Sequence, residues 1–369
     1  MNQLFRWDQM GLFLLALAAG ILPFAVPEVC AAALREGLTL CSGPLLLSLF
    51  PFLVVSRLLI QCPESDLLAL PFRLAAWGIG IRTPCAARVL CIGFLGGFAP
   101  AASAAAQAVR TGQLTAEEAD ALLPACICSG PSFVVLTVGQ SLLGSAELGV
   151  LLFASQITAN YLTAALLNRF GGVRSVKPGS AAPASPAPPR LDEILADAAI
   201  TYCKLCGFIL FFRMLAAGAG ALLPAGAGTL CSILLEVCSG CDLASRTGRW
   251  GSLLCCAALS AQGLSVLLQV RTICPPEMTL RPLYRSRLLH LPLSLALFYL
   301  LLPGGEADVF STLPARVLLM RRVPPDCALL VFAVCCMAAC TLRSGIRQVE
   351  QKQMARNAGG CCINSKTLL

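Results

Sequence analysis

The residues that could do chemistry in this sequence are polar groups inside long apolar runs. Glu236 is the sharpest case, because it lies in the segment 233–240, which is too short to span a membrane comfortably and ends in glycine. A carboxylate in hydrocarbon is costly unless it is paired or serves a site. We therefore expect Glu236 to bind a polar solute or an ion at the break of a half-helix or re-entrant hairpin. The alternative is an ion pair with an arginine that serves folding.

A second group of polar residues lies in the apolar run 258–269. On one helix, Gln262, Ser265 and Gln269 would share a face at i, i+3, i+7 spacing, with Gly263 beside them. Such a stripe would suit the path of a polar solute. The alternative is hydrogen bonding between helices, which is the usual role of Ser and Gln in membrane bundles.

Glycine and proline predict two helix breaks in the first half of the chain. Gly97 is followed by a proline at position 100, so its segment is predicted to form a hairpin tip that continues toward Gln107. Ser129 and Gly130 precede Pro131, which frees backbone carbonyls near the middle of a helix. Either break could line a cavity, or be an ordinary kink, since Gly and Pro are frequent in transmembrane helices.

Recognisable catalytic motifs are missing from the sequence. It holds no G-x-S-x-G, H-E-x-x-H or P-loop pattern, and His290 is its only histidine. The 21 cysteines are scattered through apolar runs, where free cysteine behaves as a small hydrophobe. Pairs such as Cys203 and Cys206 have C-x-x-C spacing but lack the further ligands that zinc needs. We therefore expect no enzyme, no cofactor and no metal site.

The elements that must position the polar residues are membrane helices. The 369 residues are 57% hydrophobic and 12% charged, with a mean hydropathy of +0.79, unlike a soluble chain. Nearly uncharged stretches of bilayer-spanning length include 11–34, 45–60, 148–167 and 288–302. Their continuous apolar character favours helices over a barrel. A cleaved signal peptide is the alternative for the first stretch, although a retained helix is simpler in a chain that is membrane-embedded throughout.

The net charge of +8 is spread over the connections between apolar runs. Because it forms no patch with interleaved aromatic residues, it predicts membrane topology and not nucleic-acid binding. Basic clusters within 169–190 and 271–287 predict cytoplasmic connections. The connections near Glu147 and at 306–308 lack basic residues and should lie outside.

The chain is expected to contain two halves of similar layout. The match of Gly97 with Gly263, and of 109–111 with 270–272, supports a duplication of the kind found in transporters. The fold class predicted is therefore an all-α polytopic membrane protein, with two similar halves of transmembrane helices and short re-entrant or broken helices. The expected parts are an N-terminal transmembrane helix (1–38), a first membrane half (39–170), a Pro/Ala/Ser-rich cytoplasmic linker (171–190), a second half (191–345) and a basic cytoplasmic tail (346–369).

Several of these segments resemble the YlbJ-type sporulation integral membrane proteins, which contain nucleoside-recognition or Gate domains. The resemblance covers about residues 43–290 and is carried by the motifs at 48–55, 96–98, 112–115 with 118–120, 129–133, 235–240 and 262–270. It implies a bacterial spore-former and a multi-pass protein of the cell membrane or of a membrane of the developing spore. It also implies a role in forming the spore cortex. One departure is the turn 97–103, GFAPAAS, where the family tends to carry Gly-Phe-Pro-x-Gly-Ala-Lys, so a solute preference tied to that turn does not transfer.

The function expected from residues and resemblance together is that of a permease-like sporulation protein. Its expected partners are the lipid bilayer, a small polar solute and other sporulation proteins, with no nucleic acid. The alternative is a non-transporting scaffold that recruits cortex-assembly proteins through the linker and tail. In the permease, the second-half residues would face the first-half residues across the site: Glu236, Gln262, Gly263, Ser265 and Gln269 against Gly97, Gln107, Ser129 and Gly130.

Overall fold

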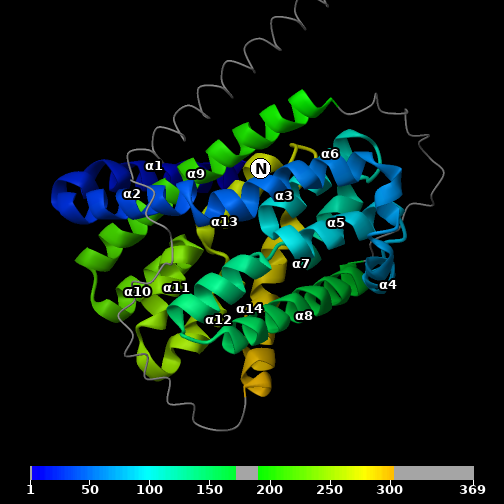
Figure 1. Ribbon diagram of the computed structural model, residues 1–369. Coiled ribbons are helices and arrows are strands. Elements are labelled where there is room, and N and C mark those ends of the chain that lie inside the picture. Colours follow the sequence, from blue (N-terminus) through cyan, green and yellow to red (C-terminus); the bar gives the residue numbers. More distant parts are fainter. Residues whose placement is uncertain (1, 172–189, 303–369) are drawn as a thin grey trace, which may run out of the picture.

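The computed structural model describes residues 2–171 and 190–302, and every regular element in these ranges is helical (Figure 1). The tail 346–369, most of the linker 171–190 and the elements expected beyond residue 302 lie outside the described residues. The helices before the linker are α1 (Asn2–Ala25), α2 (Pro27–Ser42), α3 (Pro44–Gln61), the 3-10 turn η1 (Pro63–Asp66), α4 (Leu70–Gly78), α5 (Pro84–Gly96), α6 (Phe98–Arg110), α7 (Ala116–Cys126), the π-helix η2 (Ser132–Leu142) and α8 (Ala146–Gly171). After the linker come α9 (Leu191–Leu222), α10 (Ala225–Leu235), α11 (Val237–Ser245), the 3-10 turn η3 (Gly248–Trp250), α12 (Gly251–Ala261), α13 (Gly263–Ile273) and α14 (Arg281–Leu301).

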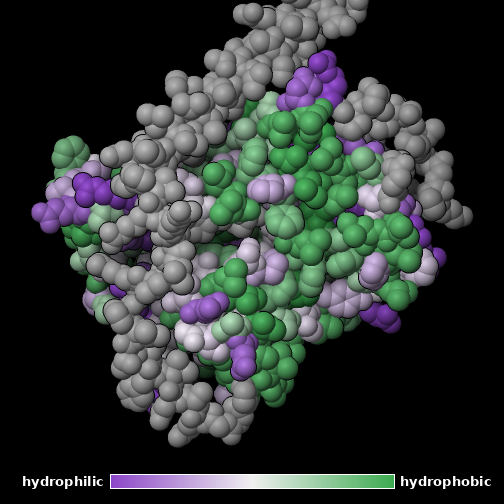
Figure 2. Space-filling model, viewed as in Figure 1, coloured by the Kyte–Doolittle hydropathy of each residue, from purple (hydrophilic) through white to green (hydrophobic). Residues whose placement is uncertain are grey.

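The described helices and their surface have the character of a membrane protein. Four stretches are long and apolar enough to cross a bilayer: Pro27–Leu47, Ala146–Gly171, Leu191–Leu222 and Gly248–Ile273. Figure 2 shows hydrophobic residues covering the face over α3, α5 and α7, with hydrophilic residues gathered toward its margins. Soluble proteins rarely expose so much contiguous apolar surface. The composition thus predicted both the helical class and the membrane setting.

The first expected helix, over 11–34, is divided in the structure. α1 ends at Ala25 and α2 begins at Pro27, with Val26 between them at φ −140° and ψ 62°. Proline has no N–H and suits the first turn of a new helix, so it starts α2 and does not extend α1. The expectation of one continuous helix there was wrong because it weighed hydropathy above this proline.

Two pairs of short helices fold back on themselves. α5 and α6 reverse at Gly97, so that a Cβ on Gly93 would lie 3.3 Å from the Cβ of Ala101. α10 and α11 reverse at Glu236, so that a Cβ on Gly240 would lie 2.8 Å from the Cα of Ile233. Straight helices would hold residues seven or eight positions apart more than about 10 Å from each other. The reversal at Gly97 agrees with the hairpin tip predicted from the sequence.

Two other helical stretches are interrupted. α7 ends at Cys126, and residues 127–130 are not helical before the π-helix η2, which agrees with the break predicted beside Pro131. α12 and α13 are separated by Gln262, whose φ is +63°. The polar stripe expected on one helix over 258–269 is therefore wrong for Gln262, since the left-handed turn removes it from the face that carries Ser265 and Gln269.

The two parts of the chain on either side of the linker pack into each other. α9 lies beside α2 and α3, α13 contacts α6, and α14 contacts both α7 and α8 (Figure 1). One polar contact fastens this arrangement: the buried carboxylate of Asp120 on α7 accepts hydrogen bonds from Thr279 N (2.8 Å), Thr279 Oγ1 (2.7 Å) and Leu280 N (3.1 Å). Asp120 thereby binds the start of α14, where the first N–H groups of a helix have no partner of their own.

We predict that Asp120→Ala destabilises the protein by roughly 2–4 kcal/mol, because it removes three charge-assisted hydrogen bonds and leaves the buried N–H of Leu280 unpaired. Unfolding of the purified full chain in detergent measures this. Glu117→Ala is the matched control, since Glu117 is an exposed acidic residue on the same helix. Equal stability of the two variants would show that Asp120 does not fasten α14.

Candidate functional site

The tip of the first hairpin lies directly against the interruption between α7 and η2. A Cβ added to Gly97 would lie 2.6 Å from Gly130 N and 3.2 Å from Cys128 O, and Gly97 has a φ of +82°. Both the close approach of backbones and the positive φ require glycine here. The tip is therefore held by backbone contact with the broken segment, and Gly97 and Gly130 lie together as the sequence predicted.

The second hairpin makes the same kind of contact with the interruption between α12 and α13. A Cβ on Gly263, which has a φ of +64°, would lie 3.0 Å from Glu236 N and 3.0 Å from Leu235 O. Gly263 therefore lets the break at Gln262 approach the tip at Glu236. In both places a tip meets a break in another helix through a glycine with positive φ.

Glu236 forms the second tip and caps the helix that follows it. The side chain is 2% exposed, its Oε1 accepts from Cys238 N at 2.8 Å, and its Oε2 accepts from Ser239 N at 2.7 Å. A carboxylate is favourable at a helix N-terminus because it meets both the unpaired N–H groups and the positive end of the helix dipole. The arginine partner considered from the sequence is not found among the described ion pairs.

A cavity of about 50 Å³, here called the tip cavity, lies where the two hairpin tips come together. Predicted site residues from both parts of the chain line it: Ser129, Gly130, Glu236 and Gln269, together with Cys238 and Val266. Gly97, Gly263 and Ser265 do not line the cavity, but they are neighbours of residues that do. Four of the nine predicted site residues therefore line this cavity, and the rest of the lining, mostly apolar, was not predicted.

Two predicted residues do not join the tip cavity. Gln262 is 1% exposed and donates from Nε2 to the carbonyl of Leu259 at 2.7 Å, which closes the end of α12. Gln107 lies one turn beyond Ser103 on α6 and lines neither of the two cavities described here. Gln107 does lie on the predicted hairpin, but it is ten residues away from the tip at Gly97.

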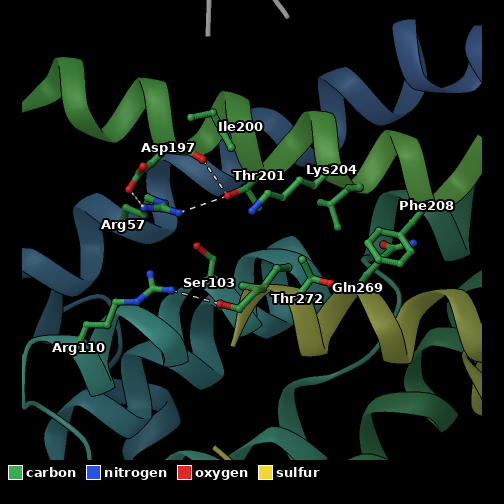
Figure 3. Close-up of a pocket in the computed structure, with 12 residues that line it drawn as sticks. Arg57, Ser103, Arg110, Asp197, Ile200, Thr201, Lys204, Phe208, Gln269 and Thr272 are labelled. Atoms are coloured by element: carbon green, nitrogen blue, oxygen red, sulfur yellow. Dashed lines mark hydrogen bonds and ion pairs between the residues drawn. The ribbon is translucent and has the colours of Figure 1, made fainter. Parts of the chain in front are cut away.

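Gln269 connects the tip cavity to a second one. Its Nε2 donates to Ser265 Oγ at 2.9 Å, while its Oε1 is buried without a hydrogen-bond partner. The second cavity, here called the basic cavity, has a volume of about 170 Å³ and is lined by Arg57, Ser103, Arg110, Asp197, Lys204 and Gln269, among others (Figure 3). Gln269 lines both cavities.

The sequence analysis missed the basic cavity. Arg57 is 7% exposed within an apolar helix, and its Nη1 lies 2.7 Å from Asp197 Oδ2, 140 residues away. An arginine inside a predicted transmembrane stretch was a usable signal, because such residues usually have a buried partner or serve a polar path. What could not be read from one sequence was which distant residues would surround it.

The carbonyl freed at the first break is satisfied from other helices. Ile127 O accepts from Arg287 Nη1 at 3.4 Å and from Asn160 Nδ2 at 3.3 Å, and Arg287 Nη2 also donates to Asn160 Oδ1 at 3.2 Å. Arg287 is 8% exposed. Because of this network, residues 127–130 can remain non-helical while the carbonyl of Ile127 keeps its partners. An unpaired carbonyl would cost several kcal/mol in a membrane.

Cysteines contribute packing and not cross-links in the described residues, none of which forms a disulfide. In the connection between α13 and α14, burial raises the pKa of the Cys274 thiol to about 12. This side chain therefore stays protonated at neutral pH and behaves as the small hydrophobe expected from the sequence.

A comparison of the chain with protein-family models, curated proteins and solved structures found no match.

We predict that Gly97→Ala lowers the stability of the protein by several kcal/mol more than Gly80→Ala. Both glycines have a positive φ, +82° and +90°, so both variants carry backbone strain; at Gly97, whose ψ of −164° is adopted essentially by glycine alone, this strain is roughly 1–3 kcal/mol. A Cβ at Gly80 meets nothing within 4 Å, whereas at Gly97 it meets the backbone of Gly130. Thermal unfolding of the full chain in detergent measures the difference. Equal losses of stability in the two variants would mean that the tip and the break are not in contact.

Proposed function

We propose that this chain is a permease-like membrane protein that passes a small polar solute between its two halves. The observation that carries the proposal is the tip cavity, where Glu236 of the second hairpin tip, Ser129 of the first break and Gln269 of α13 line one space beside the first hairpin tip. Transporters commonly place their sites where short or broken helices end near the middle of the membrane. By its resemblance to YlbJ-type proteins, we further propose that the chain acts in sporulation, in forming the spore cortex.

The order of elements supports the proposed duplication. A hairpin, an interrupted helix and a longer helix follow one another as α5–α6, α7–η2 and α8, and again as α10–α11, α12–α13 and α14. This register pairs Gly97 with Glu236 and not with Gly263, which differs from the register drawn from the sequence. In the proposal the hairpins are re-entrant, because arms of 9 to 13 residues reach only about 14–20 Å, less than the roughly 30 Å hydrocarbon core.

The proposed route runs from the basic cavity past Gln269 into the tip cavity. Gln269 is the natural selectivity element, because its buried Oε1 has no protein partner and faces a space that a solute could enter. The tip cavity holds about 50 Å³, far less than the 300–1,000 Å³ of sites for drug-sized ligands. A nucleoside therefore does not fit this arrangement, and passage of any solute requires the two halves to rock apart.

The scaffold alternative depends on the linker 171–190 and the tail 346–369, which lie almost wholly outside the described residues. It differs from the permease in which residues matter. A scaffold needs the linker and tail but tolerates changes in the cavity lining, whereas a permease needs the lining.

We predict that Gln269→Leu abolishes function without loss of folding. The replacement has a similar size and removes a buried acceptor that has no partner, which offsets the loss of the hydrogen bond to Ser265, so stability should change little. In a spore-forming bacterium lacking the chain, we expect at least 10-fold fewer heat-resistant spores with Gln269→Leu than with wild type at equal membrane abundance. Gln140→Leu, at an exposed position on η2, is the matched control.

The outcome that contradicts the proposal is full function of Gln269→Leu together with failure of a variant lacking residues 172–189, which would favour the scaffold. Glu236→Gln is a weaker test, because it also removes one of the two acceptors that cap α11. Uptake of radiolabelled uridine, ribose and alanine into proteoliposomes of the full chain then examines transport directly. Wild-type uptake no faster than that of empty liposomes for every probe would count against a permease.

A further inference from the structure

The basic cavity gathers positive charge from three separate helices. Arg57 comes from α3, Arg110 from α6 and Lys204 from α9, and Figure 3 shows Arg57 and Lys204 on one side of the space and Arg110, Ser103 and Gln269 on the other. α3, α6 and α13 all end near it, so the cavity lies at one end of the helix bundle. Its opening is flanked by exposed residues, including Arg110 and Lys204.

The charges in this cavity are not balanced by the protein. Asp197 is the one carboxylate among the lining residues, and its Oδ2 forms an ion pair with Arg57 Nη1 at 2.7 Å. Arg110 donates only to the carbonyl of Ile273, at 3.4 Å, and Lys204 has no ion pair within the described part of the chain. The buried Arg57 and the exposed Arg110 repel each other across this space, and a bound anion would reduce that repulsion.

Residues that line the cavity also carry buried polar groups without partners. Ser103 is 2% exposed and its Oγ has no hydrogen-bond partner, and the same is true of Gln269 Oε1 and Arg57 Nε. Buried groups of this kind are normally satisfied, because leaving one unpaired costs roughly 1–3 kcal/mol. Here the Ser103 hydroxyl and the Arg57 Nε–H are donors without an acceptor, and the amide oxygen of Gln269 is an acceptor without a donor.

We infer that the basic cavity binds a phosphoryl group. Guanidinium groups match phosphate oxygens with paired hydrogen bonds, and donors arriving from three helices suit a tetrahedral group better than a planar carboxylate. A phosphate carries a P–OH for part of the time near neutral pH, since its second pKa is about 6, and this hydroxyl supplies the donor that Gln269 Oε1 lacks. The volume of about 170 Å³ exceeds the roughly 150 Å³ cavity that accepts benzene.

The phosphoryl group could belong to a soluble phosphate compound or to the headgroup of an anionic lipid. Both present the same oxygens to the same residues. The inference concerns binding alone, so it stands or falls separately from transport. If the chain does carry a solute, a soluble phosphate compound in this cavity would lie next to Gln269 on the proposed route.

The test is calorimetric titration of the full chain in phosphatidylcholine nanodiscs with inorganic phosphate at constant ionic strength. We expect Arg110→Gln and Lys204→Gln each to weaken binding at least 10-fold, and Ser103→Ala to weaken it several-fold with unchanged thermal stability. Asp197→Asn should bind phosphate more tightly, because it releases Arg57 from its competing carboxylate. Arg82→Gln, an exposed arginine outside the cavity lining, should bind like wild type.

A second experiment identifies a lipid source. If the phosphoryl group belongs to a lipid, nanodiscs that contain phosphatidylglycerol raise the thermal stability of wild type but not of Arg110→Gln, while titration with inorganic phosphate gives no heat of binding. The inference is overturned if neither phosphate nor phosphatidylglycerol has an effect. It is also overturned if Arg110→Gln and Arg82→Gln respond alike, which would show an adventitious ion only.

Discussion

The structure depends on one constraint, which is that backbone groups released at a buried helix end must find partners inside the protein. In hydrocarbon no water can supply them. At the second tip the Glu236 carboxylate accepts from the N–H groups of Cys238 and Ser239, and at the first break Arg287 and Asn160 donate to the carbonyl of Ile127. Because these ends are satisfied, short helices can stop inside the bundle and their ends can approach one another.

That approach creates the two cavities. Gly97 and Gly263 bring each tip into backbone contact with a break, and the tip cavity is the space left where the ends do not fill the volume between them. Gln269 then stands between this space and the basic cavity. Ser103 Oγ, Arg57 Nε and the amide oxygen of Gln269 are buried atoms without hydrogen-bond partners on residues that line these cavities, and they are where a ligand would add most.

Much of this arrangement was predictable from local sequence, and the rest was not for physical reasons. Apolar runs fixed the helical membrane class, and glycine and proline chemistry located the tip at Gly97 and the break before Pro131. Glutamine rarely adopts a left-handed conformation, so nothing local predicted the turn at Gln262. The partners of Arg57 and Asp120 lie 140 and about 160 residues away, and such pairings follow from tertiary packing that one sequence does not reveal.

The most direct test of this account is hydrogen–deuterium exchange of the full-length protein in detergent, followed peptide by peptide. The account predicts that the amides of Glu236, Cys238, Ser239 and Gly240, and those of Gly97 and Ala101, exchange as slowly as those in the middle of α8, because these N–H groups at the tips are hydrogen-bonded inside the protein. The amide of Arg82, in the exposed connection between α4 and α5, should exchange rapidly, and Glu236→Ala should speed exchange at 238–239. Rapid exchange at both tips in wild type would contradict the account, since it would place them in water as ordinary loops.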